Sequence, residues 1–201
     1  ITTGWSGWGK VSAARATTRL LASSFNSIPV EIVMFTGVAG AVDKRLKKWD
    51  VIISNSVMQH DMDARPLFEK YVVPAIKTKK ITPNNDLLEY IYNHLRKELG
   101  KKDFSSFGNV YKGLIATVDM FISDTNKINQ LSKEISGLTA IEMEGAAFAQ
   151  VAFQERLDWL VLRVISDSAN EEANYEFKEF LSKYKLKSFN LLESFLSSLF
   201  E

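Results

Sequence analysis

Two hydrophobic patterns alternate along this chain of 201 residues. Short runs of apolar and β-branched residues are typical of buried strands, and apolar residues repeated every three or four positions are typical of helices packed on a sheet. The first pattern predicts strands over residues 30–35, 49–57, 110–116, 138–141 and 159–165. The second predicts helices over residues 10–25, 84–99, 125–135, 146–153 and 175–200. This alternation, which contains no internal repeat, predicts an α/β fold.

One segment, residues 66–83, fits neither pattern. Three prolines interrupt it and apolar residues lie between them, so we expect an irregular, partly apolar loop. A surface of this kind often contacts another subunit.

The composition is that of a packed globular protein, with 46% hydrophobic and 24% charged residues, and the length favours a single domain. The 25 basic residues nearly balance the 24 acidic ones, so the net charge of +1 indicates no nucleic-acid or membrane partner. There is no cysteine, which excludes disulfides and thiolate chemistry, and no apolar run approaches the roughly 18 residues of a membrane span. Since the first residue is Ile1 and not methionine, we expect that something upstream has been removed or left out.

Two glycine turns are expected at strand ends, where open α/β sheets bind ligands. The first contains Gly7 and Gly9 and leads into a helix, and the second contains Gly37 and Gly40 and follows the 30–35 strand. Backbone N–H groups in such turns can hold phosphate, but neither turn matches a Walker A or dinucleotide-binding pattern. Tight turns that allow close packing are the other interpretation.

Three acidic residues also follow predicted strands: Glu142, Glu144 and Asp167. Positions two apart on a helix do not face each other, so we expect at most one of the two glutamates in a given pocket. A solvated first turn of a helix is the alternative for this pair. Asp167 follows an apolar run, where burial would favour the protonated form and allow it to donate a proton, but an ordinary capping or turn aspartate is the alternative.

Two further patterns have weaker chemical meaning. His60-Asp61-Met62-Asp63 contains three side chains that can bind metal, but a polar turn is the better interpretation, and we predict no metal and no cofactor. Lysine-rich stretches over residues 44–48, 77–80 and 183–187 could bind a polyanion, although nearby acids favour solvated faces.

Six segments, in their order along the chain, resemble the nucleoside phosphorylase and nucleosidase superfamily, and within it the family of bacterial 5′-methylthioadenosine/S-adenosylhomocysteine nucleosidases. They are Ser6-Gly7-Trp8-Gly9-Lys10, Thr36-Gly37-Val38-Ala39-Gly40, His60-Asp61-Met62-Asp63, Asp119-Met120-Phe121-Ile122, Ile141-Glu142-Met143-Glu144 and Arg163-Val164-Ile165-Ser166-Asp167. The specific part of this match is the combination of Glu-Met-Glu with a later Arg-x-x-Ser-Asp.

The resemblance implies a single three-layer domain with a central mixed, barrel-like β-sheet flanked by helices. It implies a cytoplasmic homodimer, with an upstream targeting segment left open. The implied reaction is hydrolysis, without metal or cofactor, of methylthioadenosine and S-adenosylhomocysteine to adenine and a thioribose product. Such a reaction needs a proton on adenine N7, stabilisation of an oxocarbenium-like ribose and an oriented water.

The resemblance implies two catalytic residues. Asp167 is the acid at adenine N7, with Ser166 and Arg163 in support. Glu144 binds the ribose hydroxyls, where its carboxylate also opposes the charge that develops on the sugar. The other implied substrate-binding residues are Met143 against the ribose, its neighbour Glu142, Phe121 and Ile122 at adenine, Phe177 in a lid, Ala39 and Gly40 on the water side, and Trp8 where the family usually has a smaller apolar residue. Leu67, Phe68 and Pro74 are implied to come from the neighbouring subunit.

The chain departs from the family pattern in two places. The family's first strand and its water-activating glutamate fall before Ile1, so the 201 residues lack both. The family's serine in the second glycine turn is Val38, and the arginine with which phosphorylases hold phosphate is Phe35, so hydrolysis is predicted. The alternatives are a phosphorylase or nucleosidase for another purine nucleoside, and a catalytically silent protein of this fold that binds adenine or a polyanion.

Overall fold

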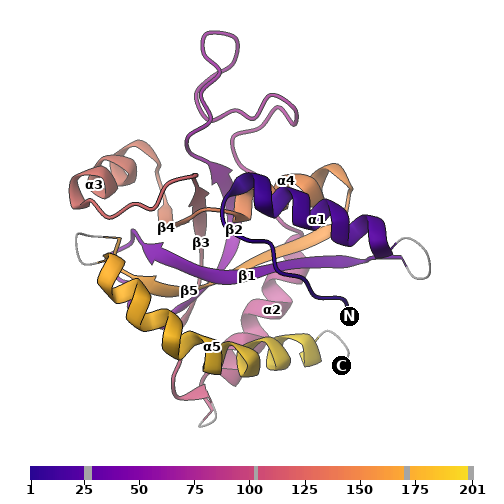
Figure 1. Cartoon of the computed structure of the whole chain (residues 1–201), viewed down its shortest axis with the longest axis vertical. Coiled ribbons are helices and arrows are strands. Elements are labelled where there is room, and N and C mark those ends of the chain that lie inside the picture. The colour runs from indigo at the N-terminus through magenta and orange to yellow at the C-terminus, as the bar shows by residue number, and fades with distance from the viewer. Residues whose placement is uncertain (25–28, 102–103, 170–172, 199–201) are drawn as a thin grey trace.

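A computed structural model describes residues 1–24, 29–101, 104–169 and 173–198 of the chain. The strands are β1 (Ile32–Ala41), β2 (Val51–Gln59), β3 (Val110–Thr117), β4 (Leu138–Glu142) and β5 (Asp158–Asp167). They form a closed barrel in the order β1-β4-β3-β2-β5 (Figure 1). β1 runs parallel to β5, and β3 runs parallel to both β2 and β4, whereas β1 with β4 and β2 with β5 are antiparallel pairs. The barrel sheet is therefore mixed.

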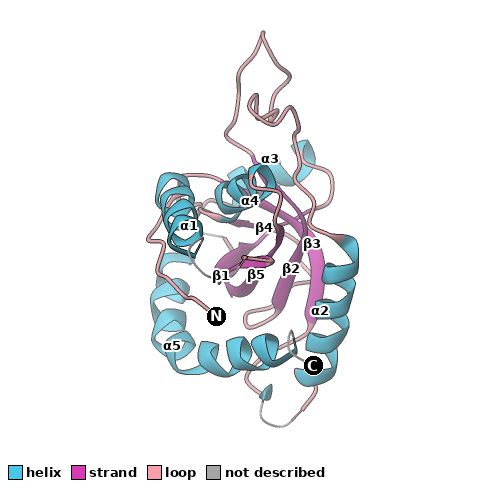
Figure 2. Ribbon diagram, turned by 90° about the vertical axis from the view of Figure 1, so that its right-hand side faces the viewer, coloured by secondary structure: helices cyan, strands magenta, loops and turns pink. Residues whose placement is uncertain are grey.

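Helices surround this barrel in the view of Figure 2. They are α1 (Lys10–Ser24), α2 (Asn85–Glu98), α3 (Thr125–Glu134), α4 (Gly145–Gln154) and α5 (Ala173–Ser198). α1 packs on α4, which packs on the strands, while α5 packs on β5 and on α2. The predicted α/β fold with a mixed, barrel-like sheet between helices is confirmed.

The helices lie close to their predicted positions. The apolar stripe of α2 buries Leu88, Ile91 and Leu95 against the barrel, and Asn84 caps the helix by accepting the Asp86 N–H at 2.9 Å. Part of the predicted 10–25 and 175–200 helices, namely Phe25, Leu199 and Phe200, lies outside the described residues.

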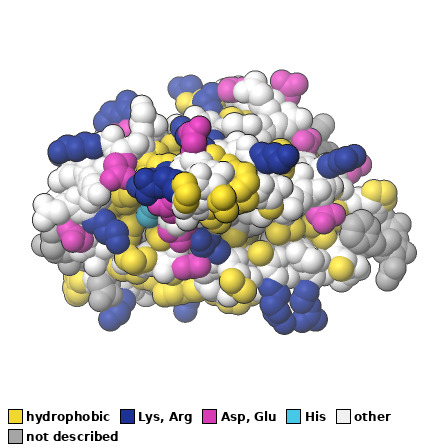
Figure 3. All heavy atoms as spheres, turned by 90° about the horizontal axis from the view of Figure 1, so that it is seen from above, with side chains coloured by type: hydrophobic (Ala, Val, Ile, Leu, Met, Phe, Trp, Pro, Cys, Tyr) yellow, Lys and Arg dark blue, Asp and Glu magenta, His cyan; other side chains and the backbone are white. Residues whose placement is uncertain are grey.

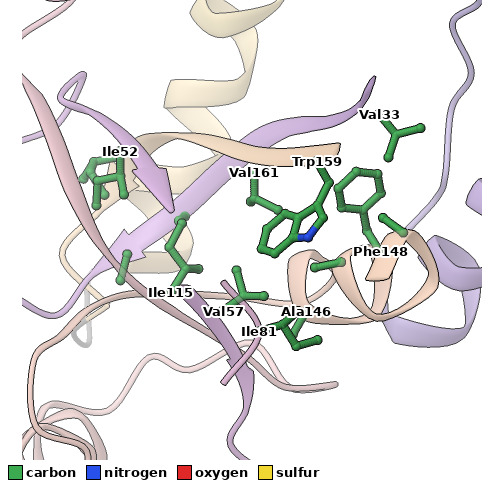
Figure 4. Packing of buried hydrophobic residues seen from close by; sticks show 14 of the residues in the cluster. Val33, Ile52, Val57, Ile81, Ile115, Ala146, Phe148, Trp159 and Val161 are labelled. Atoms are coloured by element: carbon green, nitrogen blue, oxygen red, sulfur yellow. The ribbon is translucent and has the colours of Figure 1, made fainter. Parts of the chain in front are cut away.

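Apolar side chains from strands and from α4 fill the space between the barrel and that helix (Figure 4). Val57, Ile115 and Val161 lie on strands to one side of Trp159, and Phe148 of α4 lies on its other side. Trp159 is only 2% exposed. β2 and β5 are buried along nearly their whole length, which explains the apolar runs at both ends of β2 and on either side of Arg163 in β5. This core holds the strand ends in fixed positions.

Residues 61–81 project from one end of the barrel as an irregular segment (Figure 1). Isolated bridges join Val57 to Ile81 and Val73 to Thr78, so the segment leaves β2 and returns beside it. This confirms the irregular loop that was predicted over residues 66–83. Seen from this end, hydrophobic side chains gather near the middle of the face among charged ones (Figure 3).

No helix within the described part of the chain is long and apolar enough to cross a membrane.

The prediction of a second glycine turn is wrong. β1 continues through residues 36–40, which pair with β5. The glycines are needed for another reason, which is the close approach of side chains from β5. A Cβ atom on Gly37 would overlap the Arg163 guanidinium, and one on Gly40 would lie 2.9 Å from Asp167 Oδ1.

Candidate functional site

The carboxyl ends of several strands meet at one place on the barrel. Gly40 of β1 is paired with Asp167 of β5 and also with Ile141 of β4. Glu142 follows directly and is paired with Thr117 at the end of β3. The barrel therefore brings the two acidic segments of the sequence together, although they are distant along the chain.

Asp167 is a buried carboxylate with defined partners. It is 4% exposed, and its Oδ2 accepts the Ser166 hydroxyl at 2.6 Å while its Oδ1 accepts the Ala169 N–H at 2.9 Å. The Ser166 hydroxyl also lies 3.3 Å from the carbonyl oxygen of Ala39. These contacts fix the orientation of the carboxyl group beside Gly40.

Glu142 and Arg163 form an ion pair in which each side chain is 2% exposed. Glu142 Oε2 also accepts the N–H groups of Glu144 at 3.0 Å and Gly145 at 2.7 Å, and its Oε1 accepts the Thr117 hydroxyl. Both oxygens of Glu142 thus have partners inside the protein. This geometry favours a positioning part for Glu142, which the sequence analysis grouped with the substrate-binding residues.

Glu144 lies beside this pair and keeps 16% of its side chain exposed. Its Oε1 accepts the Gly9 N–H at 2.8 Å, and its Oε2 is 3.6 Å from Arg163 Nη2. Burial raises the pKa of Glu144 above the usual glutamate value, and the negative charge of Glu142 adds to this, while Arg163 acts in the opposite direction. A titratable group perturbed by both burial and a specific charge is a candidate for function.

The helical spacing used to predict how the two glutamates face is absent from the structure. α4 begins at Gly145, so Glu142 ends a strand and Glu144 precedes the helix. The helical spacing on which the expectation rested does not apply to them, and both approach Arg163.

The first glycine turn is present as predicted. Gly7 and Gly9 have φ angles of 82° and 88°, in the left-handed region that favours glycine. α1 starts immediately afterwards, and the N–H groups of Gly9 and Lys10 donate to Glu144 Oε1 at 2.8 Å and to Asp119 Oδ1 at 2.7 Å. Two carboxylates from distant parts of the chain therefore satisfy donors at the start of α1.

Three predicted aromatic residues lie together next to this turn. The ring centroid of Phe177 is 6.0 Å from that of Trp8 and 5.6 Å from that of Phe121, both in edge-on arrangements. Trp8 is 61% exposed and Phe121 is 40% exposed, which leaves ring surface for a planar ligand. Ile122 is buried on the same segment as Phe121, and Met143 is half-buried between the two glutamates.

Leu67, Phe68 and Pro74 lie on the projecting segment, separate from the strand ends (Figure 1). Leu67 is 84% exposed and Phe68 is 38% exposed, whereas Pro74 is half-buried. Within the described part of this one chain, no hydrogen bond or ring contact joins them to the other predicted site residues.

A surface hollow of about 800 Å³ lies elsewhere, at the amino end of β5. It is lined by parts of residues 75–84 and 153–159 and contains none of the predicted site residues. Asp167 is at the opposite end of the same strand. The titratable groups and aromatic rings, and not this hollow, therefore define the candidate site.

The weaker sequence patterns have simple structural explanations. Among the described residues, no group of three or more His, Asp and Glu side chains could hold a metal ion. Asp61 pairs with Lys10 at 2.8 Å, and burial lowers the pKa of the adjacent His60. In the lysine-rich stretches, Lys79 pairs with Glu69 and Lys183 pairs with Glu179.

Two residues to which the sequence analysis gave no part complete the site. Thr117 donates its hydroxyl to Glu142 and accepts the Ala146 N–H at 2.8 Å, so it joins β3 to the start of α4. Asp119 accepts the Lys10 N–H, as described above. Both follow an apolar strand, which is the same signal that singled out Asp167.

A model of the phosphorylase superfamily matches residues 2–197 of the chain. The chain is also 36% identical over 197 residues to the 5′-methylthioadenosine/S-adenosylhomocysteine nucleosidase of Bacillus cereus, an alignment that covers 96% of this chain and 79% of the relative. The chain belongs to this nucleosidase family of the phosphorylase superfamily. The resemblance found in the sequence is confirmed.

Solved structures agree with this assignment. The Streptococcus pneumoniae nucleosidase with the transition-state inhibitor MT-ImmA matches with a TM-score of 0.82 at 34% identity, covering 96% of this chain and 79% of that one. The futalosine hydrolase of Helicobacter pylori matches with a TM-score of 0.82 at 30% identity, covering 96% and 77%. Family members with different named activities therefore share this fold.

Proposed function

We propose that this protein is an enzyme that hydrolyses the N-glycosidic bond of 5′-methylthioadenosine and S-adenosylhomocysteine and releases adenine. The observation that carries the proposal is the pair of largely buried carboxylates, Asp167 and Glu144, at adjoining strand ends beside exposed aromatic rings. The Bacillus cereus and Streptococcus pneumoniae relatives are named as nucleosidases for these two substrates, which supports the substrate class.

In the proposed mechanism, Asp167 donates a proton to adenine N7 as the bond to C1′ breaks. Protonation makes adenine a better leaving group, because the electrons of the breaking bond then remain on a neutral base. The Ser166 hydroxyl and the Ala169 N–H hold the carboxyl group, so that its position is set before substrate binds. Arg163 acts indirectly, through its ion pair with Glu142.

Glu144 is proposed to act on the ribose. Its carboxylate accepts hydrogen bonds from the ribose hydroxyls and opposes the positive charge that grows on the sugar. The site around it is largely shielded from water, so this electrostatic contribution is stronger than it would be in bulk solvent. Met143, its neighbour, packs against the ribose.

The aromatic residues are proposed to bind the base. Phe121 stacks on adenine, the backbone of Ile122 meets its edge, and Phe177 and Trp8 cover it. The edge-on contacts of Phe177 with both other rings support this grouping.

Water is proposed to attack C1′ from the side of Ala39 and Gly40. Phosphate is not the proposed nucleophile, because the positions at which phosphorylases hold it are apolar here. The Phe35 ring lies 4.6 Å from the Arg163 guanidinium carbon and stacks on Phe148 at 5.0 Å, and Val38 packs against a buried apolar cluster. These contacts support hydrolysis.

We further propose that residues 1–201 act as one nucleosidase domain in the cytoplasm. The working unit is proposed to be a homodimer. In it, Leu67, Phe68 and Pro74 of one chain cover the 5′ substituent of the substrate held by the other chain. The exposure of Leu67 on a projecting segment supports this arrangement.

The first experiment measures adenine release from methylthioadenosine by the full natural protein, with and without phosphate. Futalosine serves as the comparison substrate. We expect the full protein to release adenine at a rate that does not depend on phosphate. A rate that requires phosphate would identify a phosphorylase, and silence from a folded full protein would identify a binding protein.

Asp167→Asn tests the acid. The amide cannot donate the proton, so we expect kcat to fall by at least about a hundredfold. The control is Asp158→Asn, which changes an exposed aspartate at the other end of the same strand and should leave kcat unchanged. Circular dichroism checks that both variants are folded, and retained turnover in Asp167→Asn would exclude the proposed role.

A further inference from the structure

We propose that Asp119 is a positioning residue for cleavage of the glycosidic bond. It holds the first glycine turn, and through that turn it fixes the carboxylate of Glu144. This inference rests on the proposed function, because it concerns the sugar side of the same site.

Asp119 contacts the first glycine turn so closely that little room is left for a side chain at Gly9. Its Oδ1 accepts the Lys10 N–H at 2.7 Å, from a position 109 residues further along the chain. A Cβ atom on Gly9 would lie only 3.0 Å from the same oxygen. Together with the φ angle of 88° at Gly9, this close approach leaves the turn few alternative conformations.

Glu144 depends on that turn for its orientation. The Gly9 N–H bonds its Oε1 at 2.8 Å, whereas the 3.6 Å distance from Oε2 to Arg163 is too long for a hydrogen bond. Gly9 and Lys10 are adjacent, so any movement that breaks the Asp119 contact also moves the donor that holds Glu144. Trp8 precedes both and would move with them.

The start of α1 has a second anchor that does not involve Asp119. Lys10 Nζ lies 2.8 Å from both carboxylate oxygens of Asp61 and 3.4 Å from Gln59 Oε1. Removal of the Asp119 carboxylate should therefore loosen the turn without detaching the helix. The expected consequence is a displaced catalytic group in a folded protein.

The experiment uses the full natural protein with the variants Asp119→Ala, which removes the acceptor, and Asp119→Asn, which keeps an acceptor oxygen. The control is Asp124→Ala. Asp124 lies on the same loop and accepts the N–H groups of Asn126 and Lys127 at 2.8 and 3.2 Å, so it caps α3 as Asp119 caps α1. The measurements are kcat and KM for methylthioadenosine, the Kd values of MT-ImmA and of adenine, and the melting temperature.

We expect Asp119→Ala to lower kcat/KM by about tenfold to a hundredfold, because small displacements of catalytic groups cost rates of this size. The affinity for MT-ImmA should fall by a similar factor, while the affinity for adenine, which has no sugar and meets only Trp8 of this turn, should fall clearly less. Asp119→Asn should restore most of the loss. Asp124→Ala should lower the melting temperature and leave both affinities and kcat/KM as they are in the wild type.

Wild-type kinetics in Asp119→Ala would overturn the inference and leave the proposed function intact. Equal losses of adenine and MT-ImmA affinity would also overturn it, because Asp119 would then act through Phe121 and the base. A folded wild-type protein that neither releases adenine nor binds MT-ImmA would overturn the proposed function as well. If Asp119→Ala does not fold, Asp119→Glu, which displaces the acceptor by one methylene, should show the same selective loss, and its absence would exclude the positioning role.

Discussion

The position of Glu144 makes its ionised form unfavourable in the folded protein. The fold buries its carboxyl group and places a second carboxylate, Glu142, nearby, and these raise its pKa. The favourable partners are Arg163 at 3.6 Å and the Gly9 N–H, and they offset the cost only in part. A group of this kind is typical of sites in which stability is given up for function.

We predict that Glu144→Gln changes the pH dependence of stability. In the wild type the folded state binds this proton more tightly than the unfolded state, so the free energy of unfolding falls as pH rises above about 4.5, the usual glutamate pKa. Glutamine has the shape of the neutral form and does not titrate. The stability of the variant relative to the wild type should therefore increase with pH.

Urea unfolding of both proteins at several values between about pH 4 and pH 7 measures this difference. The same variant should lose activity, because an amide cannot oppose the positive charge on the ribose. A stability difference that stays constant across the pH range would mean that Glu144 is not desolvated in the folded protein.

At the scale of elements, the pairing of β1 with β5 depends on the absence of a side chain at Gly37 of β1. Arg163 of β5 occupies the space where a Cβ atom would be, and it keeps its ion pair with Glu142 there. The guanidinium also lies over the Phe35 ring at 4.6 Å. One missing side chain on β1 thus allows a buried charge to reach its partner on β4.

We predict that Gly37→Ala destabilises the protein by about 1–3 kcal/mol, because the added methyl group forces Arg163 or the strand to move. Activity should fall too, since Arg163 is the cation beside Glu144. The control is Gly100→Ala, at an exposed position after α2 where the nearest atom to the new Cβ is 3.6 Å away. That change should leave stability unchanged or raise it by up to about 1 kcal/mol. Chemical denaturation gives both values, and equal stabilities would show that Arg163 does not need the space at Gly37.

Gly37 also shows where sequence reasoning reaches its limit. Periodicity locates strands and helices because burial of one face is a local pattern, and the five predicted strands and five predicted helices are all present. The run of small residues over positions 36–40 was interpreted as a turn because its reason is a contact with β5, more than a hundred residues away in the chain. The same holds for Glu142 and Glu144, whose convergence on Arg163 depends on where α4 begins.

At the scale of the molecule, the candidate site is built from segments that no single motif contains. The glycine turn, the end of β3, the end of β4 and the end of β5 each contribute polar groups to it. Family resemblance identified most of these residues, but the link from Asp119 to the glycine turn exists only in the folded chain. Leu67, Phe68 and Pro74, which were predicted as site residues, lie on the projecting segment and outside this group of contacts.

The projecting segment gives the last prediction, which concerns assembly. Leu67 is 84% exposed and lies between exposed Pro66 and Phe68, and exposed apolar groups of this kind are typical of contacts between proteins. If Leu67 inserts into a second chain, Leu67→Asp places a charge in that contact, and burial of an unpaired charge is strongly unfavourable. Analytical ultracentrifugation should then find a dimer for the wild type and a monomer for the variant.

The control for this change is Phe189→Asp, which puts the same charge at another exposed apolar position, 66% exposed on α5. This variant should remain a dimer. Because Leu67 is proposed to cover the 5′ substituent of the substrate in the partner chain, Leu67→Asp should also raise KM for methylthioadenosine and leave the Kd of adenine unchanged. A monomeric wild type would contradict this prediction, and so would a dimeric Leu67→Asp variant with wild-type KM. Either result would mean that the projecting segment takes part neither in assembly nor in substrate binding. The 5′ pocket would then have to come from a single chain.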